Sequence, residues 1–177
     1  GATYAQVAKL TASDAASGDN FGKSVAIDGG TVVVGASHYD NGGSGAVYVF
    51  LTTDGGATYG QVAKLTANDG ATDESFGNSV AIDGDIFLIG AYWPDDGFGS
   101  DSGSAYVFAL NPPFTAAPTH LPTRHTISWP QIAKMSANDA AASDEFGSSV
   151  AIDGDTVVVG SPYDDDGGSG SGSAYVF

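Results

Sequence analysis

Hydrophobic and polar positions follow the same order three times along the chain. Each copy opens with an alternating segment, and a nearly all-apolar run follows it after a short turn. Alternation with period two predicts a half-buried strand, whereas a short continuous apolar run predicts a strand buried on both faces. The alternating segments are Ser24–Asp28, Ser79–Asp83 and Ser149–Asp153, and the apolar runs begin at Thr31, Ile86 and Thr156. An Asp-Gly pair joins the two segments in each copy, which predicts a hairpin because glycine accepts positive φ without steric cost.

Two further segments belong to each copy. The third begins at Gly45, Gly103 and Gly172 and alternates small with aromatic residues, which predicts a half-buried strand. The fourth is found at Gln6–Ala12, Gln61–Ala67 and Gln131–Ala137 and alternates around Lys9, Lys64 and Lys134. We expect these lysines to lay their stems along the outer face of the sheet. Four short antiparallel strands in each copy are typical of a propeller blade.

The recurrence itself predicts an all-β propeller or propeller segment with three four-stranded antiparallel blades. A lone four-stranded sheet leaves apolar faces in water, whereas neighbouring copies hide them by stacking. The repeats span approximately residues 1–55, 56–125 and 126–177, and a Pro- and Thr-rich insertion at 109–128 separates the last two. We also expect Phe21, Phe76 and Phe146 to wedge between blades.

The order of segments leaves the last blade incomplete. The chain begins on a segment of the fourth type and reaches Phe177 on one of the third type. The last blade must therefore be completed by another segment or another chain. One arrangement is a longer propeller of about six or seven blades, which we favour, and the other is strand donation between chains.

Charge excludes several classes of partner. The chain has 21 acidic and 5 basic residues and a formal net charge of −16. Binding to nucleic acid or to an anionic membrane needs clustered Lys and Arg, so neither partner is expected. No stretch is long enough for membrane insertion. Cations and basic protein surfaces are the natural counterparts. The chain has no Cys, which excludes disulfides and thiolate metal sites.

Short motifs flank the apolar run in each copy. Phe-Gly pairs stand at 21–22, 76–77 and 146–147, and the run ends in Gly-Ala or Gly-Ser at Gly35, Gly90 and Gly160. These motifs resemble FG-GAP repeats, the blade unit of the integrin α-subunit propeller. The resemblance implies an extracellular or cell-surface protein that binds or adheres through loops at one rim, without catalysis. In integrins the turn between the first two strands is a long Asp-rich loop that holds Ca²⁺. Here the turn is Asp-Gly-Gly or Asp-Gly-Asp, which offers too few oxygens for the six to eight ligands of calcium.

A different set of acids is the candidate calcium site. It follows the apolar run in each copy, within segments rich in Gly and Ser, and comprises Asp40, Asp95, Asp96, Asp101, Asp164, Asp165 and Asp166. Carboxylates and free backbone carbonyls in short loops suit Ca²⁺. The alternative is that these side chains cap their own turns.

Aromatic residues beside these acids are the candidate ligand contacts. They are Trp93, Phe98 and Tyr163. Exposed aromatics suit sugar stacking or protein hot spots, although Trp93 alternatively fills a gap near the channel mouth. The expected partners are a protein or glycan ligand, or copies of the chain itself. Two alternatives stay open: a structural subunit of an extracellular assembly built by strand donation, and a carbohydrate-binding or carbohydrate-processing propeller. The apolar runs carry no acid, base or nucleophile, so we assign no catalytic residue.

Overall fold

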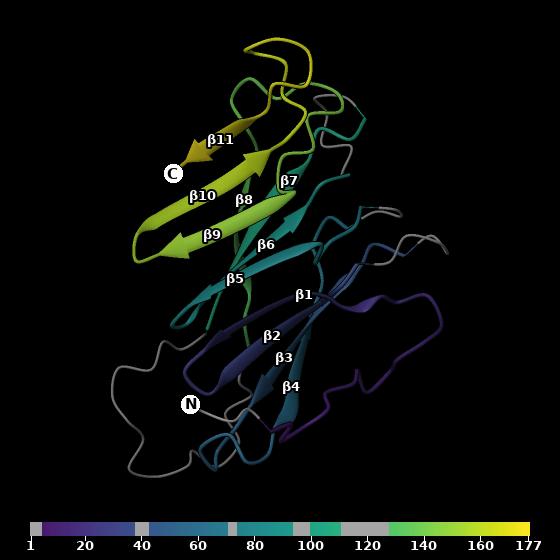
Figure 1. Cartoon of the computed structure of the whole chain (residues 1–177), viewed down its shortest axis with the longest axis vertical. Helices are drawn as coiled ribbons and strands as arrows, with labels where there is room; N and C mark the ends of the chain where they lie inside the picture. Colours follow the sequence, from purple (N-terminus) through teal and green to yellow (C-terminus); the bar gives the residue numbers. More distant parts are fainter. Residues whose placement is uncertain (1–4, 38–42, 71–73, 94–99, 111–127) are drawn as a thin grey trace.

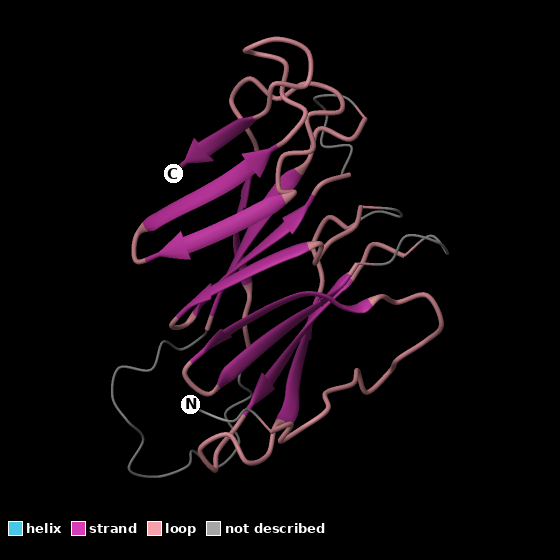
Figure 2. Cartoon of the chain, viewed as in Figure 1, coloured by secondary structure: helices cyan, strands magenta, loops and turns pink. Residues whose placement is uncertain are grey.

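The computed structural model describes residues 5–37, 43–70, 74–93, 100–110 and 128–177. Within these ranges the chain consists of strands, turns and loops without a helix (Figures 1 and 2). No described segment forms a helix that could cross a membrane. The fold class predicted from the hydrophobic pattern, all-β with antiparallel blades, is confirmed.

The strands of the described residues form three antiparallel sheets, and they follow chain order in each sheet. The first sheet contains β1 (Phe21–Asp28), β2 (Thr31–Ala36), β3 (Ala46–Leu51) and β4 (Gly60–Leu65). The second contains β5 (Ser79–Asp83), β6 (Ile86–Ala91), β7 (Ser104–Ala109) and β8 (Gln131–Met135). The third contains only β9 (Ser149–Asp153), β10 (Thr156–Ser161) and β11 (Ser173–Val176). The described residues therefore form a partial propeller with two four-stranded blades and a third blade of three strands.

Tight turns set the register of the first two strands in each sheet. Asp28 pairs with Thr31, Asp83 with Ile86 and Asp153 with Thr156. The glycines after these aspartates have φ values of 52°, 54° and 56°. Such left-handed backbone is where glycine is favoured, which explains the repeated Asp-Gly pair.

The sheets stack so that their first strands are neighbours. In Figure 1, β5 lies between β1 and β9, and it packs against both. The largest core cluster gathers Val33, Val47 and Val49 of the first sheet with Phe76 and Phe87 of the second. A second cluster joins Leu88 of the second sheet to Phe146 and Val159 of the third. Each blade thus buries its apolar faces against its neighbours.

The Phe-Gly motif occupies these joints. Phe76 and Phe146 are completely buried, and their amides bond to the carbonyls of Ser44 and Ser102 in the preceding sheet at 2.9 and 3.0 Å. The prediction that these two rings wedge between blades is confirmed. Phe21, at the same position in the first sheet, is only half-buried because the structure places no sheet before it.

Two predictions about strands were wrong. The segment Gln6–Ala12 forms no strand, and its Leu10 and Ala12 pack against the first sheet through their side chains instead. β3 and β7 are buried along both faces rather than half-buried. They stand in the middle of their sheets, where both faces meet a neighbouring blade or its loops. Nearly all of the predicted insertion at 109–128 lies outside the described residues, but Trp129, which follows it, is buried and stacks on Phe87.

Candidate binding site

One end of the stacked sheets carries the longer loops. In an antiparallel blade the β2–β3 and β4–β5 connections emerge at the same end, opposite the Asp-Gly turns. We call this end the long-loop rim and define it by the described residues 13–20, 37, 43–45, 66–70, 74–78, 92–93, 100–103, 136–148 and 162–172. Its described acids are Asp14, Asp19, Asp69, Glu74, Asp101, Asp139, Asp144, Glu145, Asp164, Asp165 and Asp166. The rim therefore favours cationic or hydrogen-bonding ligands over anionic ones.

A polar groove opens between the first and second sheets at this rim. Its volume is about 410 Å³, and it is lined by Asn20, Phe21, Gly22, Lys23, Ser37, Ser75 and Tyr92. The lining combines amide, hydroxyl and ammonium groups with one aromatic hydroxyl side chain. No described lining residue carries a carboxylate, so the groove lacks the acid pair that glycoside hydrolysis needs.

The predicted contact Trp93 lies next to this groove and is partly engaged by the protein. Its ring meets that of Tyr92 edge-on, with centroids 5.1 Å apart. Burial raises the pKa of Glu145 above its ordinary value, while hydrogen bonds from Trp93 and Ser148 oppose the rise. The indole therefore links the second sheet to the loop before β9 and holds Tyr92 at the groove.

The structure describes only some of the other predicted ligand contacts and calcium ligands. Those outside the described residues are Asp40, Asp95, Asp96 and Phe98. Tyr163 is 56% exposed. Asp101 has a φ of 63°, and its carbonyl accepts a hydrogen bond from the amide of Glu145 at 3.1 Å. The structure therefore brings Asp101 and Trp93 together around Glu145 and leaves Tyr163 on another loop.

Asp164 and Asp165 cap their own loop. Asp164 accepts a hydrogen bond from the amide of Asp166 at 2.9 Å and another from the Tyr175 hydroxyl. Asp165 accepts a bond from the amide of Gly170 at 2.6 Å. Among the described residues no three acids or histidines form a group suited to a metal ion. Calcium binding stays a prediction.

The Asp-Gly turns use their carboxylates for a different purpose. Asp28 accepts a hydrogen bond from the amide of Gly84 at 2.8 Å, and Asp83 accepts one from Gly154 at 2.6 Å. Each turn is thereby bonded to the corresponding turn of the next blade. These carboxylates have the role of joining blades, and the short turn does not fit a resident calcium ion.

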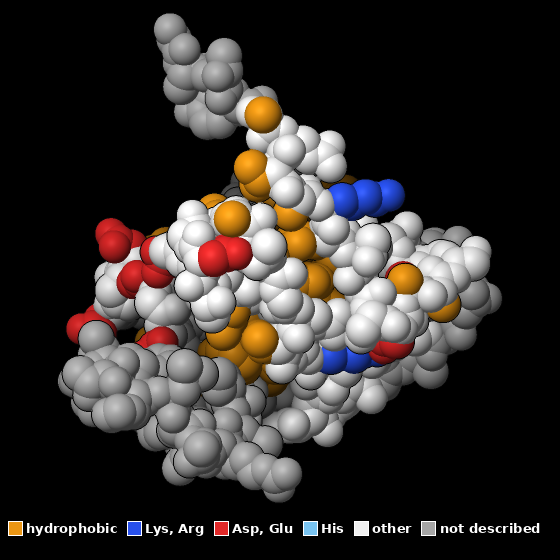
Figure 3. All heavy atoms as spheres, turned by 90° about the horizontal axis from the view of Figure 1, so that it is seen from below, with side chains coloured by type: hydrophobic (Ala, Val, Ile, Leu, Met, Phe, Trp, Pro, Cys, Tyr) orange, Lys and Arg blue, Asp and Glu red, His pale blue; other side chains and the backbone are white. Residues whose placement is uncertain are grey.

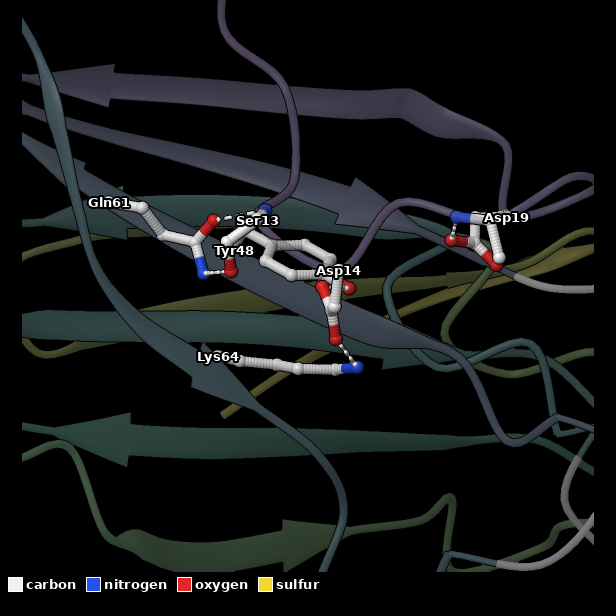
Figure 4. A network of polar contacts seen from close by, with 7 residues as sticks. Ser13, Asp14, Asp19, Tyr48, Gln61 and Lys64 are labelled. Carbon is white, nitrogen blue, oxygen red and sulfur yellow. Dashed lines mark hydrogen bonds and ion pairs between the residues drawn. The ribbon is translucent and has the colours of Figure 1, made fainter.

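A clamp of Asp, Tyr and Lys, which the sequence analysis missed, fixes the outer strand of each complete blade. In the first sheet Lys64 Nζ lies 2.6 Å from Asp14 Oδ2 and 5.4 Å from the centre of the Tyr48 ring. The Tyr48 hydroxyl donates to Asp14 at 2.9 Å (Figure 4). Hydrogen bonds from Lys64 and Tyr48 hold the pKa of Asp14 below its ordinary value of 3.8.

The second sheet repeats the ion pair and the contact between lysine and tyrosine ring. Lys134 Nζ lies 2.7 Å from Asp69 Oδ2 and 5.3 Å from the centre of the Tyr106 ring. Gln61 and Gln131 add a bond each, accepting from the amides of Ser13 and Asn68 at 2.9 Å. Lys64 and Lys134 therefore each form an ion pair with an acid of the rim. The sequence analysis expected only that their stems lie along the outer face of the sheet. The signal available in the sequence was an Asp two residues after the alanine that ends each fourth segment.

A family comparison decides what these repeated features are. A protein-family model described as FG-GAP repeat matches residues 4–50, 59–108 and 129–177. The chain belongs to the FG-GAP repeat family. A search of curated proteins returned no match. Each matched FG-GAP repeat starts with a fourth-type segment, so each complete blade takes its outer strand from the following repeat.

The third FG-GAP repeat has an incomplete clamp. Tyr175 donates to Asp164, and burial together with the carboxylates of Asp164 and Asp139 raises the pKa of the tyrosine. The repulsion from Asp164 and Asp139 also raises the pKa of Asp166. The described part of the chain places no lysine at these carboxylates. This cluster therefore has the acids and the tyrosine of a clamp but lacks its cation.

Proposed function

We propose that this FG-GAP protein is a non-catalytic binding module of an extracellular or cell-surface protein, which holds a neutral glycan or a glycosylated protein at the long-loop rim. The observation that carries the proposal is the polar groove of about 410 Å³ at Tyr92 and Lys23. Its mixture of hydroxyl, amide and ammonium groups with an aromatic ring matches the hydroxyls and apolar ring faces of sugars. The net charge of −16 disfavours acidic glycans.

The position of the groove also supports binding. Blade two departs from the repeat here, with Tyr92-Trp93 where the other copies have Ser37-His38 and Pro162-Tyr163. A single ligand needs a place that differs from its rotational equivalents. The Trp93 and Tyr92 pair provides that difference, and its contact with Glu145 keeps the tyrosine in place before a ligand arrives.

The experiment is a titration of the chain with a panel of neutral oligosaccharides, followed by the fluorescence of Trp93. Trp129 is buried in the core and contributes a constant background. We expect Tyr92→Ala and Lys23→Ala to weaken binding by about tenfold or more, as residues at the centre of a contact do. Tyr163→Ala, which removes an exposed tyrosine from another loop, is the control and should leave the affinity unchanged.

Two results would count against this proposal. If no oligosaccharide changes the fluorescence, the groove is not a glycan site. If Tyr163→Ala loses binding while Tyr92→Ala keeps it, the ligand lies on the third blade instead. Calcium dependence through the Asp-rich loops belongs to the same proposal and is tested by thermal melting below.

A further inference from the structure

Tyr106 belongs to the core cluster that joins the first and second sheets. None of its surface is exposed, and its ring meets those of Phe76 and Phe108 edge-on, with centroids 5.4 and 5.9 Å apart. Lys134 Nζ lies 5.3 Å from the centre of the same ring. The ring is therefore held by its neighbours, and they fix the place of its hydroxyl oxygen.

The hydroxyl group of Tyr106 differs from its counterparts in the other two sheets. It is buried, and among the described residues it has no hydrogen-bond partner. Tyr48, at the same position in the first sheet, donates to Asp14 at 2.9 Å. Tyr175 of the third sheet donates to Asp164. A buried hydroxyl without a hydrogen bond costs free energy, and such groups in folded proteins are mostly satisfied by a protein atom or an ordered water.

Two carboxylates lie close to this hydroxyl. Burial raises the pKa of Tyr106 above its ordinary value, and the charges of Asp69 and Glu74 raise it further. Neither carboxylate completes a hydrogen bond with the hydroxyl. Figure 3 shows acidic side chains at the surface on one face of the molecule, whereas Glu74 is only 6% exposed. A donor and two acceptors are therefore gathered inside the joint.

The second repeat departs from the first at two positions around the tyrosine. Glu74 stands two residues before the Phe-Gly motif, where the first repeat has the shorter Asp19. Ser104 begins β7, where the first repeat has Ala46. Ser104 is completely buried, and its contact with the tyrosine opposes the rise in the pKa of the tyrosine hydroxyl. The second blade thus has polar groups at this depth that the first blade lacks.

We propose that an ordered water molecule is built into this joint, where it accepts a hydrogen bond from Tyr106 Oη and donates its own hydrogens to the carboxylates of Asp69 and Glu74. One donor and two acceptors match the hydrogen-bonding capacity of water, and buried waters typically make about three hydrogen bonds. The proposal is independent of the glycan groove, because none of these three residues lines that groove.

The charges around the hydroxyl favour water over a metal ion. Lys134 Nζ lies 2.7 Å from Asp69 Oδ2, so the ammonium group already supplies a counter-charge for one carboxylate. A metal ion would be repelled by this ammonium group, whereas a neutral water is not. In addition, no three acids or histidines among the described residues form a group suited to a metal ion.

The bridge would connect two parts of the second repeat. Asp69 and Glu74 belong to the loop before β5, and Tyr106 lies in the middle of the sheet on β7. Glu74 stands two residues before Phe76, the buried ring of the Phe-Gly motif. The water therefore fixes the segment that leads into the joint, as the direct bond between Tyr48 and Asp14 does for the first repeat.

A high-resolution crystal structure of the chain tests the position of the water directly. We expect an isolated oxygen at about 2.5–3.0 Å from Tyr106 Oη and from one oxygen of each carboxylate, the range of O–H···O hydrogen bonds. A calcium ion in its place would show six to eight ligands at about 2.3–2.6 Å and would overturn the proposal. A direct hydrogen bond from Tyr106 to Asp69, with no water between them, would overturn it as well.

Removal of the hydroxyl tests the bridge in solution. Tyr106→Phe keeps the ring and should lower the melting temperature by about 2–4 °C, the shift that the loss of one hydrogen bond causes in a chain of this size. Tyr48→Phe, which loses a direct bond of 2.9 Å, gives the reference loss. Tyr163→Phe removes a hydroxyl from a tyrosine that is 56% exposed and should change nothing. A Tyr106→Phe variant as stable as the wild type, or more stable, would contradict the bridge, because removing an unsatisfied hydroxyl costs nothing.

A double-mutant cycle then tests whether Tyr106 and Glu74 share the water. Glu74→Gln keeps the size of the side chain and removes its charge. If both residues bind one water, the loss in melting temperature of the double variant should be smaller than the sum of the two single losses. Glu74→Gln combined with Tyr48→Phe is the matched control and should be additive, because Tyr48 bonds within the first repeat. Additive losses for Glu74 and Tyr106 would show that no water joins them.

Discussion

Single residues in this protein have roles that depend on the blade beside them. Lys64 and Lys134 close clamps, whereas Lys9 has no described partner although its local sequence is the same. Phe76 is fully buried, whereas Phe21 is half-buried. The local sequence therefore determines which side chain stands at each position of the repeat. Its contacts and its burial depend on whether a neighbouring sheet packs against it.

The clamp predicts a change in the titration of Asp14. Its pKa lies below 3.8 because Lys64 and Tyr48 donate hydrogen bonds to the carboxylate. A carboxyl group with a depressed folded pKa contributes stability above its unfolded pKa and loses it as pH falls through the folded value. Lys64→Met should raise the pKa of Asp14 toward 3.8 and reduce the loss of stability below that pH.

The measurement is an NMR titration of the aspartate side chains between about pH 2 and pH 6, a range that spans the ordinary carboxyl pKa. Lys23→Met is the control, because Lys23 has no part in the shift of Asp14. An unchanged Asp14 titration in Lys64→Met would show that the ion pair does not persist in solution.

At the scale of elements, the joint between blades is the main source of stability. Strand pairs within a sheet satisfy backbone hydrogen bonds, and the largest completely buried apolar side chains lie in the two core clusters that join neighbouring sheets. A smaller cluster packs Leu10 and Ala12 against the first sheet. Gly35 and Gly90 permit this contact, since a Cβ at either would lie 2.0 Å from a carbonyl oxygen of the next sheet. The glycine of the family motif is thus a requirement of close stacking rather than of a turn.

The joint predicts unequal costs for the same substitution in two blades. Phe76→Ala removes a fully buried ring from the joint between the first two sheets and should lower the free energy of unfolding by about 3–5 kcal/mol. Phe21→Ala should cost clearly less because its ring is only half-buried. Urea denaturation of both variants gives the comparison, and equal losses would contradict the stacking that the structure shows.

At the scale of the whole molecule, charge determines which ligands the long-loop rim suits. The chain carries 21 acidic and 5 basic residues, and many of the acids lie in the rim. The rim therefore suits cations and neutral polar ligands.

Calcium binding by the Asp-rich loops is the prediction at this scale. Millimolar Ca²⁺ should raise the melting temperature, and a chelator should reverse the rise, because an ion that binds only the folded state stabilises it by mass action. Asp101→Asn should reduce the increase. Mg²⁺ at equal concentration controls for general screening of the acidic rim. Identical melting curves with Ca²⁺ and with chelator would exclude the site.

The sequence by itself determined the repeated unit of this protein. Alternation in Ser79–Asp83, the apolar run from Ile86 and the Asp-Gly pair between them are enough to predict a hairpin, and its recurrence predicts stacked blades. The order of segments also predicted that the last blade lacks a strand. These features follow from spacing along the chain, because side-chain period and turn chemistry are local properties.

Only the tertiary structure decided how the repeats meet. It showed that Gln6–Ala12 forms no strand, that β3 and β7 are buried on both faces, and that Asp28 and Asp83 bond to the next blade. It also brought Tyr92 beside Asn20 and Lys23, which are far from it in sequence, around one groove. Such contacts depend on which faces and edges find a neighbour, and a one-dimensional pattern does not contain that information.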